Sequence, residues 1–370
     1  MPNPIYLDNN ATTPLDDEVL DIMKQALLLP FNPSSVHGYG RDAKLLLNEA
    51  RSSIAKHLDV ESDSLIFTSG GTESMNMLIK GLYPNKGLIL TSSIEHPCIH
   101  ETLLALGKDK ISYVPTNSWG APALKDIEAH LTQDVSCMVF SAVYSETGVK
   151  LDLEGVAHLA HQRNIPLIID GVALLGKEPF KISQGIHGMG FSSHKLHGPQ
   201  GVGMVFIAPN AKCKPLMQGG HQEYSLRPGT ENLAGILGFA KAVSLAYDHL
   251  TTNRVHMLEL RNHFESSLKQ ALKISINGDG PRVCNTSNIM FDDIDGETLL
   301  LQLDRALIYA SLGSACSSGA LEPSRILLNM GLPRKKAKNS IRFSFSRKTL
   351  KTDVDAAIFT IIELVKNQIG

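Results

Sequence analysis

The alternation of short apolar runs with amphipathic segments is the feature that most constrains how this chain can fold. Short apolar runs are typical of buried strands, and apolar residues recurring at positions i, i+3 and i+4 are typical of helices that cover a sheet. The apolar runs are 64–68, 87–92, 137–143, 166–170 and 201–208, and the amphipathic segments between them include 72–82, 96–107 and 153–163. This pattern predicts a three-layer α/β domain with a mostly parallel sheet.

The pattern changes near residue 250. Two long helical segments, 231–250 and 254–272, are followed by fewer and shorter apolar runs. A chain of 370 residues is long enough for a large core and a smaller companion. We therefore expect a large α/β domain over residues 12–250 and a smaller α+β domain formed by residues 1–11 and 251–370.

Charge and composition exclude several classes of partner. The chain is 43% hydrophobic and 19% charged, with a formal net charge of -2 and a pI near 6.7, which gives no electrostatic footprint for nucleic acid or anionic lipid. The short basic cluster at 333–338 is interpreted as a solvated surface. No run approaches the roughly 18 apolar residues of a membrane span, and the first residues resemble neither a secretory signal nor a transit peptide. We expect a cytoplasmic protein that binds neither nucleic acid nor membranes.

One of the cysteines stands in an unusual setting. The five cysteines form no C-x-x-C pair, so the sequence indicates neither a disulfide framework nor a metal site. Cys98 and Cys137 fit packing in the core or at a helix edge, whereas Cys316 lies among glycine, alanine and serine in the stretch GSACSSGALEPS, 313–324. A nucleophilic thiolate needs access and a lowered pKa, and a soft loop gives access. Cys316 is either a mobile nucleophile or part of an ordinary linker.

Two segments indicate an anion site and a carboxylate beside it. In FTSGGTES, 67–74, an apolar run enters Ser-Gly-Gly-Thr and then a helix, which is suited to phosphate because free backbone N–H groups and the helix dipole face outward. A threonine-capped helix start is the alternative. Asp170 ends the apolar run 165–170, and ligands of open α/β sheets bind beyond the carboxyl ends of strands. A cap for the following turn is the alternative for Asp170.

A lysine completes the pattern of a single ligand. Lys195 lies in FSSHKLHGPQGVG, 191–203, just before an apolar run. A lysine held in a pocket can lose its proton and attack a carbonyl, although a lone lysine is usually a surface residue. A phosphate site, a carboxylate for a ring nitrogen and an amine for an aldehyde together match pyridoxal 5'-phosphate.

At this point the chain resembles a cysteine desulfurase, of the first of the two desulfurase groups, which serves nitrogen fixation and iron–sulfur assembly. The motifs that carry the resemblance span the chain in family order: YLDNNATTP, NPSSVHGYGR, FTSGGTES, EHPCI, SETGV, SSHKLHGPQG, RPGTEN, GSACSSGALEPS and RFSFSR. The resemblance implies fold type I of the pyridoxal-phosphate enzymes. It also implies conversion of L-cysteine to L-alanine, with the sulfur held on Cys316 as a persulfide and passed to an acceptor such as an iron–sulfur scaffold.

The resemblance also assigns roles to individual residues. It implies that Lys195 is the Schiff-base lysine, Asp170 the partner of the pyridine nitrogen, and His96 the histidine that stacks on the ring. It further implies phosphate ligands at Gly71, Thr72, Ser192 and His194, a phosphate ligand supplied by a second subunit at Thr230, and substrate-carboxylate ligands at Asn32 and Arg342. A homodimer with shared active sites follows from the role of Thr230. No metal is implied.

Several positions depart from the family pattern. Tyr144 and Ser145 stand where two asparagines are usual, so the resemblance implies that Ser145 replaces an asparagine that contacts the cofactor ring. Ala173 replaces a glutamine that bonds the phenolic oxygen of the ring, Gln200 replaces a lysine, and Tyr224 replaces an arginine. A hydrogen bond to a charged oxygen is commonly worth about 1.5–3 kcal/mol, although water can replace it. We expect a perturbed Schiff-base pKa and slow turnover.

Two other functions stay open at the level of sequence. The same fold supports other pyridoxal-phosphate reactions, such as transamination or selenocysteine lysis. A degenerate, non-enzymatic homologue that acts as an assembly partner would also explain Ser145 and Ala173.

Overall fold

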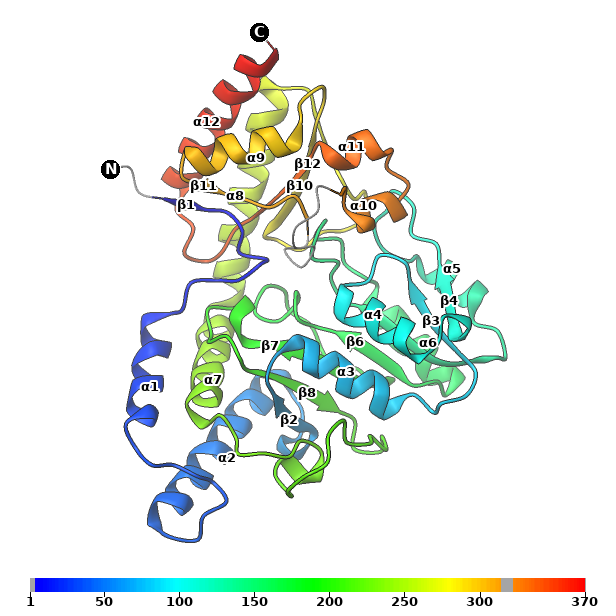
Figure 1. Ribbon diagram of the computed structural model, residues 1–370, viewed down its shortest axis with the longest axis vertical. Coiled ribbons are helices and arrows are strands. Elements are labelled where there is room, and N and C mark those ends of the chain that lie inside the picture. The colour runs from blue at the N-terminus through cyan, green and yellow to red at the C-terminus, as the bar shows by residue number, and fades with distance from the viewer. Residues whose placement is uncertain (1–3, 314–321, 370) are drawn as a thin grey trace.

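The structure is a computed structural model that describes residues 4–313 and 322–369. Within these residues the strands form a seven-stranded, a three-stranded and a two-stranded sheet. The large sheet and its helices occupy the lower part of Figure 1, and the two small sheets lie above them beside α8, α9 and α12. The helices are α1 (Asp17–Leu27), α2 (Gly38–Leu58), α3 (Gly71–Leu82), α4 (Pro97–Leu106), α5 (Leu124–His130), α6 (Leu153–Arg163), α7 (Leu233–Asp248), α8 (Leu250–Ala271), α9 (Gly296–Arg305), α10 (Arg325–Asn329), α11 (Arg334–Lys338) and α12 (Lys351–Ile369).

The large sheet has the strand order β2-β8-β7-β6-β5-β3-β4. Its strands are β2 (Leu65–Thr68), β3 (Leu88–Ser92), β4 (Ile111–Val114), β5 (Val135–Ser141), β6 (Leu167–Asp170), β7 (Ile186–Ser192) and β8 (Gly203–Ile207). Neighbouring strands from β4 to β7 pair in parallel, and β8 pairs antiparallel with both β7 and β2. The prediction of an α/β fold with a mostly parallel sheet is confirmed, and all five predicted apolar runs overlap strands.

Helices cover both faces of this sheet, because the strands carry apolar side chains on both faces and each face forms its own hydrophobic core. In β6, Leu167 and Ile169 pack with α2, α6 and α7, whereas Ile168 packs on the opposite face with α3 and α4. Successive residues of a strand point to opposite faces, so a strand buried on both sides is apolar throughout. The result is the three-layer arrangement that the sequence pattern predicts.

A separate core fills the upper part of the molecule. Strands β9 (Ile274–Ile276), β10 (Thr286–Phe291) and β12 (Ser340–Ser344) form one small sheet, and β1 (Ile5–Tyr6) pairs in parallel with β11 (Ile308–Tyr309). Leu7, near the start of the chain, shares this core with residues of α8, α9 and α12. The division into residues 12–250 against 1–11 and 251–370 stays a prediction, with which this separation of cores agrees.

The sequence pattern does not predict strand β7, and the glycines of this strand explain why. The strand carries Gly188 and Gly190, and glycine weakens a strand pattern because it has no side chain to pack. Helix α3 lies directly against these glycines: a Cβ atom at Gly188 would be 2.6 Å from Leu78 Cδ2, and one at Gly190 would be 2.8 Å from Met75 Sδ. The glycines therefore set the close approach of α3 to the sheet.

Replacing Gly188 with valine tests this close approach. Overpacking a well-packed core typically costs about 1–3 kcal/mol, so we expect the free energy of unfolding in urea to fall by about that amount. Gly38→Val, at the first residue of α2, is the matched control because the nearest atom to a Cβ there is Arg41 Nη2 at 4.0 Å. Equal losses of stability in the two variants would contradict the packing argument.

Candidate active site

A cavity of about 220 Å³ opens at the carboxyl ends of β5, β6 and β7. Ligands of open α/β sheets bind at this edge. Nine of the predicted site residues line it: Gly71, Thr72, His96, Ser145, Asp170, Ser192, His194, Lys195 and Arg342. The strand order of the large sheet therefore brings residues far apart in the sequence to one place, and Arg342 joins them from β12 of the three-stranded sheet.

The predicted anion site forms one wall of the cavity. Gly70 precedes α3 with φ 154°, a backbone conformation that L side chains rarely adopt, and a Cβ atom at Gly203 would lie 2.7 Å from Gly70 Cα. These glycines let the chain turn tightly between β2 and α3. The N-terminus of the 12-residue helix α3, at Gly71 and Thr72, faces the cavity beside Ser192. Backbone N–H groups and the helix dipole make this wall suited to an anion.

Asp170 ends β6 as predicted and is 7% exposed. Its Oδ1 accepts the backbone N–H of Val172 at 2.9 Å, and its Oδ2 accepts the thiol of Cys98 at 3.8 Å. Burial raises the pKa of Asp170 to about 6, while the Val172 N–H and the positive charge of Lys195 oppose this rise. The carboxylate is thus positioned to accept a hydrogen bond from a ligand in the cavity.

His96 is the N-cap residue of α4. Its Nδ1 accepts the backbone N–H of Cys98 at 3.2 Å, so the neutral ring carries its proton on Nε2. Burial, together with the positive charges of Lys195, Arg325 and Arg342, lowers the pKa of His96 to about 4. The imidazole is therefore neutral near pH 7.

Lys195 reaches the cavity from the short turn after β7. Its Nζ donates to the backbone carbonyls of Asn10 and Ala11 at 2.6 and 2.7 Å, which fixes the amine against the N-terminal segment. The neighbouring His194 contacts Thr12 through Nδ1 at 3.1 Å. The N-terminal segment thus forms part of the site.

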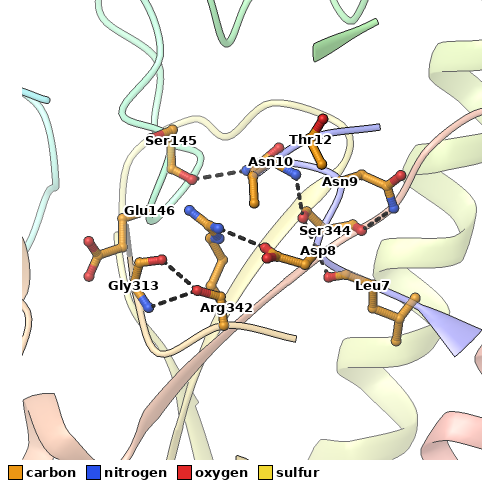
Figure 2. Close-up of polar contacts among 12 residues, drawn as sticks. Leu7, Asp8, Asn9, Asn10, Thr12, Ser145, Glu146, Gly313, Arg342 and Ser344 are labelled. Carbon is orange, nitrogen blue, oxygen red and sulfur yellow. Dashed lines mark hydrogen bonds and ion pairs between the residues drawn. The ribbon is translucent and has the colours of Figure 1, made fainter. Parts of the chain in front are cut away.

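Arg342 approaches from β12, in the upper part of the molecule. Its Nη2 donates to Asp8 Oδ1 at 2.7 Å, as Figure 2 shows, and the side chain is 2% exposed. Asn10, also in Figure 2, donates from Nδ2 to the backbone carbonyl of Ser145 at 2.9 Å. The buried Nε of Arg342 has no hydrogen-bond partner among the described residues, so the guanidinium retains donor capacity.

Three predicted site residues are not among those that line the cavity. Asn32 lies between α1 and α2, where its Oδ1 accepts the N–H of Ser34 at 2.9 Å. Thr230 is exposed, on the segment before α7. Cys316 lies outside the described residues. The roles of these three residues stay predictions.

Comparison with known proteins decides the family. The class-V aminotransferase family profile matches residues 5–357. The chain belongs to this family. It is 36% identical to "Cysteine desulfurase IscS" of Dictyoglomus turgidum over 99% of this chain and 95% of that protein, and 35% identical to "Cysteine desulfurase NifS" of Azotobacter vinelandii over 98% and 92%. A solved structure titled "NIFS-LIKE PROTEIN" superposes with a TM-score of 0.90 at 33% identity, covering 98% of this chain and 100% of that one.

These matches confirm both the resemblance to cysteine desulfurases and the prediction of fold type I. The class-V aminotransferases and their cysteine desulfurase members are pyridoxal-phosphate enzymes, which agrees with the gathering of Asp170 and Lys195 in one cavity. Among the described residues, no helix has the length and apolar character needed to cross a membrane.

Sequence reasoning missed two reactive side chains of this class-V aminotransferase cavity. Cys98, which we expected to pack in the core or at a helix edge, is buried at the start of α4 but also lines the cavity. Lys177 lines it as well, and its Nζ donates to Asn10 Oδ1 at 3.1 Å. Burial lowers the pKa of Lys177 to about 7, with Lys195 adding to the effect. Cys98 stands two residues after His96, and Lys177 stands seven residues after Asp170. This closeness in the sequence to two predicted site residues was the signal that could have indicated them.

A buried carboxylate supports the segment that carries His96. Glu95 is 0% exposed; its Oε1 accepts the hydroxyls of Ser92 and Tyr144 at 2.7 and 2.9 Å. Its Oε2 accepts the N–H and hydroxyl of Ser141 at 2.9 and 2.6 Å. Burial raises the pKa of Glu95 to about 7. Tyr144, which departs from the family pattern, is thus one of the residues that donate a hydrogen bond to Glu95.

Glu95 makes the stability of the enzyme depend on pH. The folded chain holds the carboxyl proton of Glu95 more tightly than the unfolded chain, in which this glutamate has its ordinary pKa of 4.5. The folded state therefore loses stability as pH rises from 4.5 toward 7. The loss is at most roughly 3 kcal/mol. A glutamine side chain at this position could accept from Ser141 and donate to the two hydroxyls, so we expect Glu95→Gln to gain stability relative to the wild type over this range. Urea unfolding at several pH values measures the difference, and a constant difference would contradict this role.

Proposed function

We propose that the protein is a pyridoxal-phosphate-dependent cysteine desulfurase. It removes sulfur from L-cysteine, releases L-alanine and holds the sulfur on Cys316 as a persulfide, for iron–sulfur cluster assembly or another sulfur-transfer pathway. The observation that carries the proposal is the meeting of Lys195, Asp170 and the start of α3 in one cavity. Relatives named cysteine desulfurase cover nearly the whole chain, which supports the same reaction.

The donor set of the cavity fits the cofactor. When bound, pyridoxal 5'-phosphate supplies an electrophilic carbonyl and a ring that stores the electrons released from the substrate. The cradle at Gly71 has no room for a side chain, because a Cβ atom there would lie 2.9 Å from Val172 Cγ2. Phosphate would take hydrogen bonds from Gly71, Thr72, Ser192 and His194, Asp170 would accept the ring N–H, and Lys195 would hold the carbonyl carbon.

The substrate is held and deprotonated by residues of this chain. We assign the carboxylate of L-cysteine to Arg342, because a planar guanidinium binds carboxylate in a bidentate manner. The amino group of L-cysteine would replace Lys195 at the carbonyl carbon, and the Lys195 Nζ released in this way takes the α-proton. His96 has its proton on Nε2 and its Nδ1 occupied by the Cys98 N–H, so it donates rather than accepts. Asn32 is the second proposed carboxylate ligand.

Sulfur transfer is assigned to Cys316. Its thiolate attacks the sulfur of the substrate, the substrate's carbon–sulfur bond breaks, and the electron pair stays with the carbon that becomes the methyl group of alanine. The new sulfur–sulfur bond is the persulfide. An acceptor protein takes the outer sulfur, which returns Cys316 to its thiolate.

A homodimer in a reducing compartment, such as the cytoplasm, completes the proposal. Large apolar side chains are exposed on and between α1 and α2: Leu27, Leu28, Val36, Tyr39 and Leu45. Exposed apolar patches of this kind mark interaction sites, and the proposed role of Thr230 requires a second copy of the chain. A free nucleophilic thiol also requires reducing conditions.

Stoichiometry tests the reaction class. The purified protein is incubated with pyridoxal 5'-phosphate, L-cysteine and a reductant, and sulfide and alanine are measured together. Equal yields are expected. Mercaptopyruvate in place of sulfide and alanine, in a parallel reaction that also contains a 2-oxo acid as amino acceptor, would show a transaminase. Activity with selenocysteine but none with cysteine would show a selenocysteine lyase, and no turnover together with no cofactor absorbance would show a non-enzymatic homologue.

Ala173→Gln tests whether the altered ring contacts slow the enzyme. Ala173 lines the cavity, and glutamine there would add an amide donor to its wall. We expect the pH midpoint of the cofactor absorbance to move and turnover to rise by about tenfold, the equivalent of one good hydrogen bond. An unchanged midpoint and unchanged turnover would show that Ala173 has no such effect.

A further inference from the structure

One wall of the cavity gathers three metal-ligating side chains, of which the proposed reaction uses two. His96, Cys98 and Asp170 each offer one donor atom, and these atoms lie within 4.8 Å of one another. Imidazole nitrogen, thiolate sulfur and carboxylate oxygen are the protein ligands of Zn²⁺. Cys98 has no part in the proposed desulfurase reaction, so its place beside the other two needs its own explanation.

We propose that His96, Cys98 and Asp170 form a Zn²⁺ site in the cofactor-free protein, and that the metal and pyridoxal 5'-phosphate exclude each other. The exclusion rests on the proposed function, because His96 and Asp170 are the residues assigned to the cofactor. Metal binding itself rests on the three side chains alone.

The distances suit a tetrahedral ion. With Zn–S near 2.3 Å and Zn–N or Zn–O near 2.0 Å, neighbouring ligand atoms of a tetrahedral site are separated by roughly 3.5 Å. His96 Nδ1 lies 3.0 Å from Cys98 Sγ, and Cys98 Sγ lies 3.8 Å from Asp170 Oδ2. Side-chain shifts of about half an ångström bring these two edges to the ideal length, and the third edge, between His96 and Asp170, lies within 4.8 Å and has to shorten by at most about 1.4 Å. The fourth position opens to the cavity, where water or a solute can complete the coordination.

The backbone holds the ligands in place. His96 and Cys98 flank Pro97, the first residue of α4, so their spacing is fixed by the helix start. Asp170 is held through Oδ1 by the Val172 N–H at 2.9 Å, which leaves Oδ2 directed at the thiol. Such outer contacts orient metal ligands and strengthen binding.

The charges of the bound site balance. The neutral imidazole of His96 offers Nδ1 to the ion in exchange for the hydrogen bond that Nδ1 accepts from the Cys98 N–H, and the carboxylate of Asp170 offers Oδ2. The thiol proton leaves to solvent as the sulfur binds the ion. A dication with one thiolate, one carboxylate and a neutral imidazole has no net charge. This balance matters because Lys177, Lys195, Arg325 and Arg342 lie around the site.

Cobalt provides a direct readout, because Co²⁺ replaces Zn²⁺ in such sites and a thiolate ligand adds a near-ultraviolet charge-transfer band. The full-length chain is stripped of cofactor and titrated with Co²⁺ in a Cys316→Ser background, which removes the thiol that lies outside the described residues. We expect one Co²⁺ per chain with a thiolate band, and displacement of the Co²⁺ by Zn²⁺. Adding Cys98→Ser removes the band and weakens Zn²⁺ binding by at least about 100-fold. Cys213→Ser is the matched control and retains both, since Cys213 lies away from the cavity.

Two results would overturn the metal site: no thiolate band in the stripped chain, or a band that survives Cys98→Ser. Loading with pyridoxal 5'-phosphate before the titration should prevent the band. If the loaded chain still gives the full band, mutual exclusion is wrong. Failure of the proposed function looks different, because pyridoxal 5'-phosphate would then give no protein-bound absorbance even when no metal is present.

Discussion

Cys316→Ala should stop the release of sulfide from L-cysteine while leaving the cofactor absorbance of the protein intact. The expected loss of turnover exceeds about a thousandfold, since removing the nucleophile from a group of residues that act together costs up to about 10⁶-fold in other enzymes. The absorbance is retained because the residues assigned to the cofactor, such as Lys195 and Asp170, are unchanged in this variant. Sulfide assays and a visible spectrum on the same preparation measure both effects.

Cys213→Ala is the matched control for this loss. Cys213 is a partly exposed free thiol that is not among the residues that line the cavity, so its removal should leave sulfide release unchanged. Sulfide release by Cys316→Ala at the wild-type rate would contradict the assignment of the nucleophile.

Lys195→Ala should abolish turnover and remove the covalent attachment of the cofactor. Lys195 is assigned both the bond to the cofactor and the transfer of the α-proton; a positioned general base alone contributes about 10²–10⁴-fold. The alanine variant also leaves the carbonyls of Asn10 and Ala11 without the amine that donates to them. Turnover with L-cysteine and the spectrum after gel filtration measure the two losses.

Lys195→Arg separates chemistry from folding. Arginine can still donate to the carbonyls of Asn10 and Ala11, but it stays protonated and cannot attack a carbonyl. We expect this variant to unfold at nearly the wild-type urea concentration and to be as inactive as Lys195→Ala. Measurable desulfurase activity in Lys195→Arg would show that another amine, such as Lys177, performs the chemistry.

The sequence predicts the residues at the sheet edge of the cavity well, because these residues end an apolar strand or begin an amphipathic helix. Asp170 ends an apolar strand, and Gly71 and Thr72 begin an amphipathic helix; the parallel order of strands then brings these ends to one edge. Such positions follow from local residue pattern and general sheet geometry.

Other parts of the site depend on contacts between distant segments, which no local pattern reports. Lys195 donates a hydrogen bond to the backbone carbonyl of Asn10, which lies 185 residues earlier in the chain. The neighbours of Cys98 in the sequence indicate a packing residue, and its thiol meets Asp170 only after the fold brings the start of α4 to the end of β6. Strand β7 is obscured by glycines that serve the packing of α3, so its pattern lacks the apolar run expected of a buried strand.

The central claim is that the Lys195 amine holds a carbonyl cofactor in this cavity, and reductive trapping tests it most directly. The protein loaded with pyridoxal 5'-phosphate is treated with borohydride, digested and mapped by mass spectrometry. We predict one cofactor per chain on the peptide that contains Lys195. A cofactor fixed to the peptide of Lys177, or no fixed cofactor at all, would contradict the account.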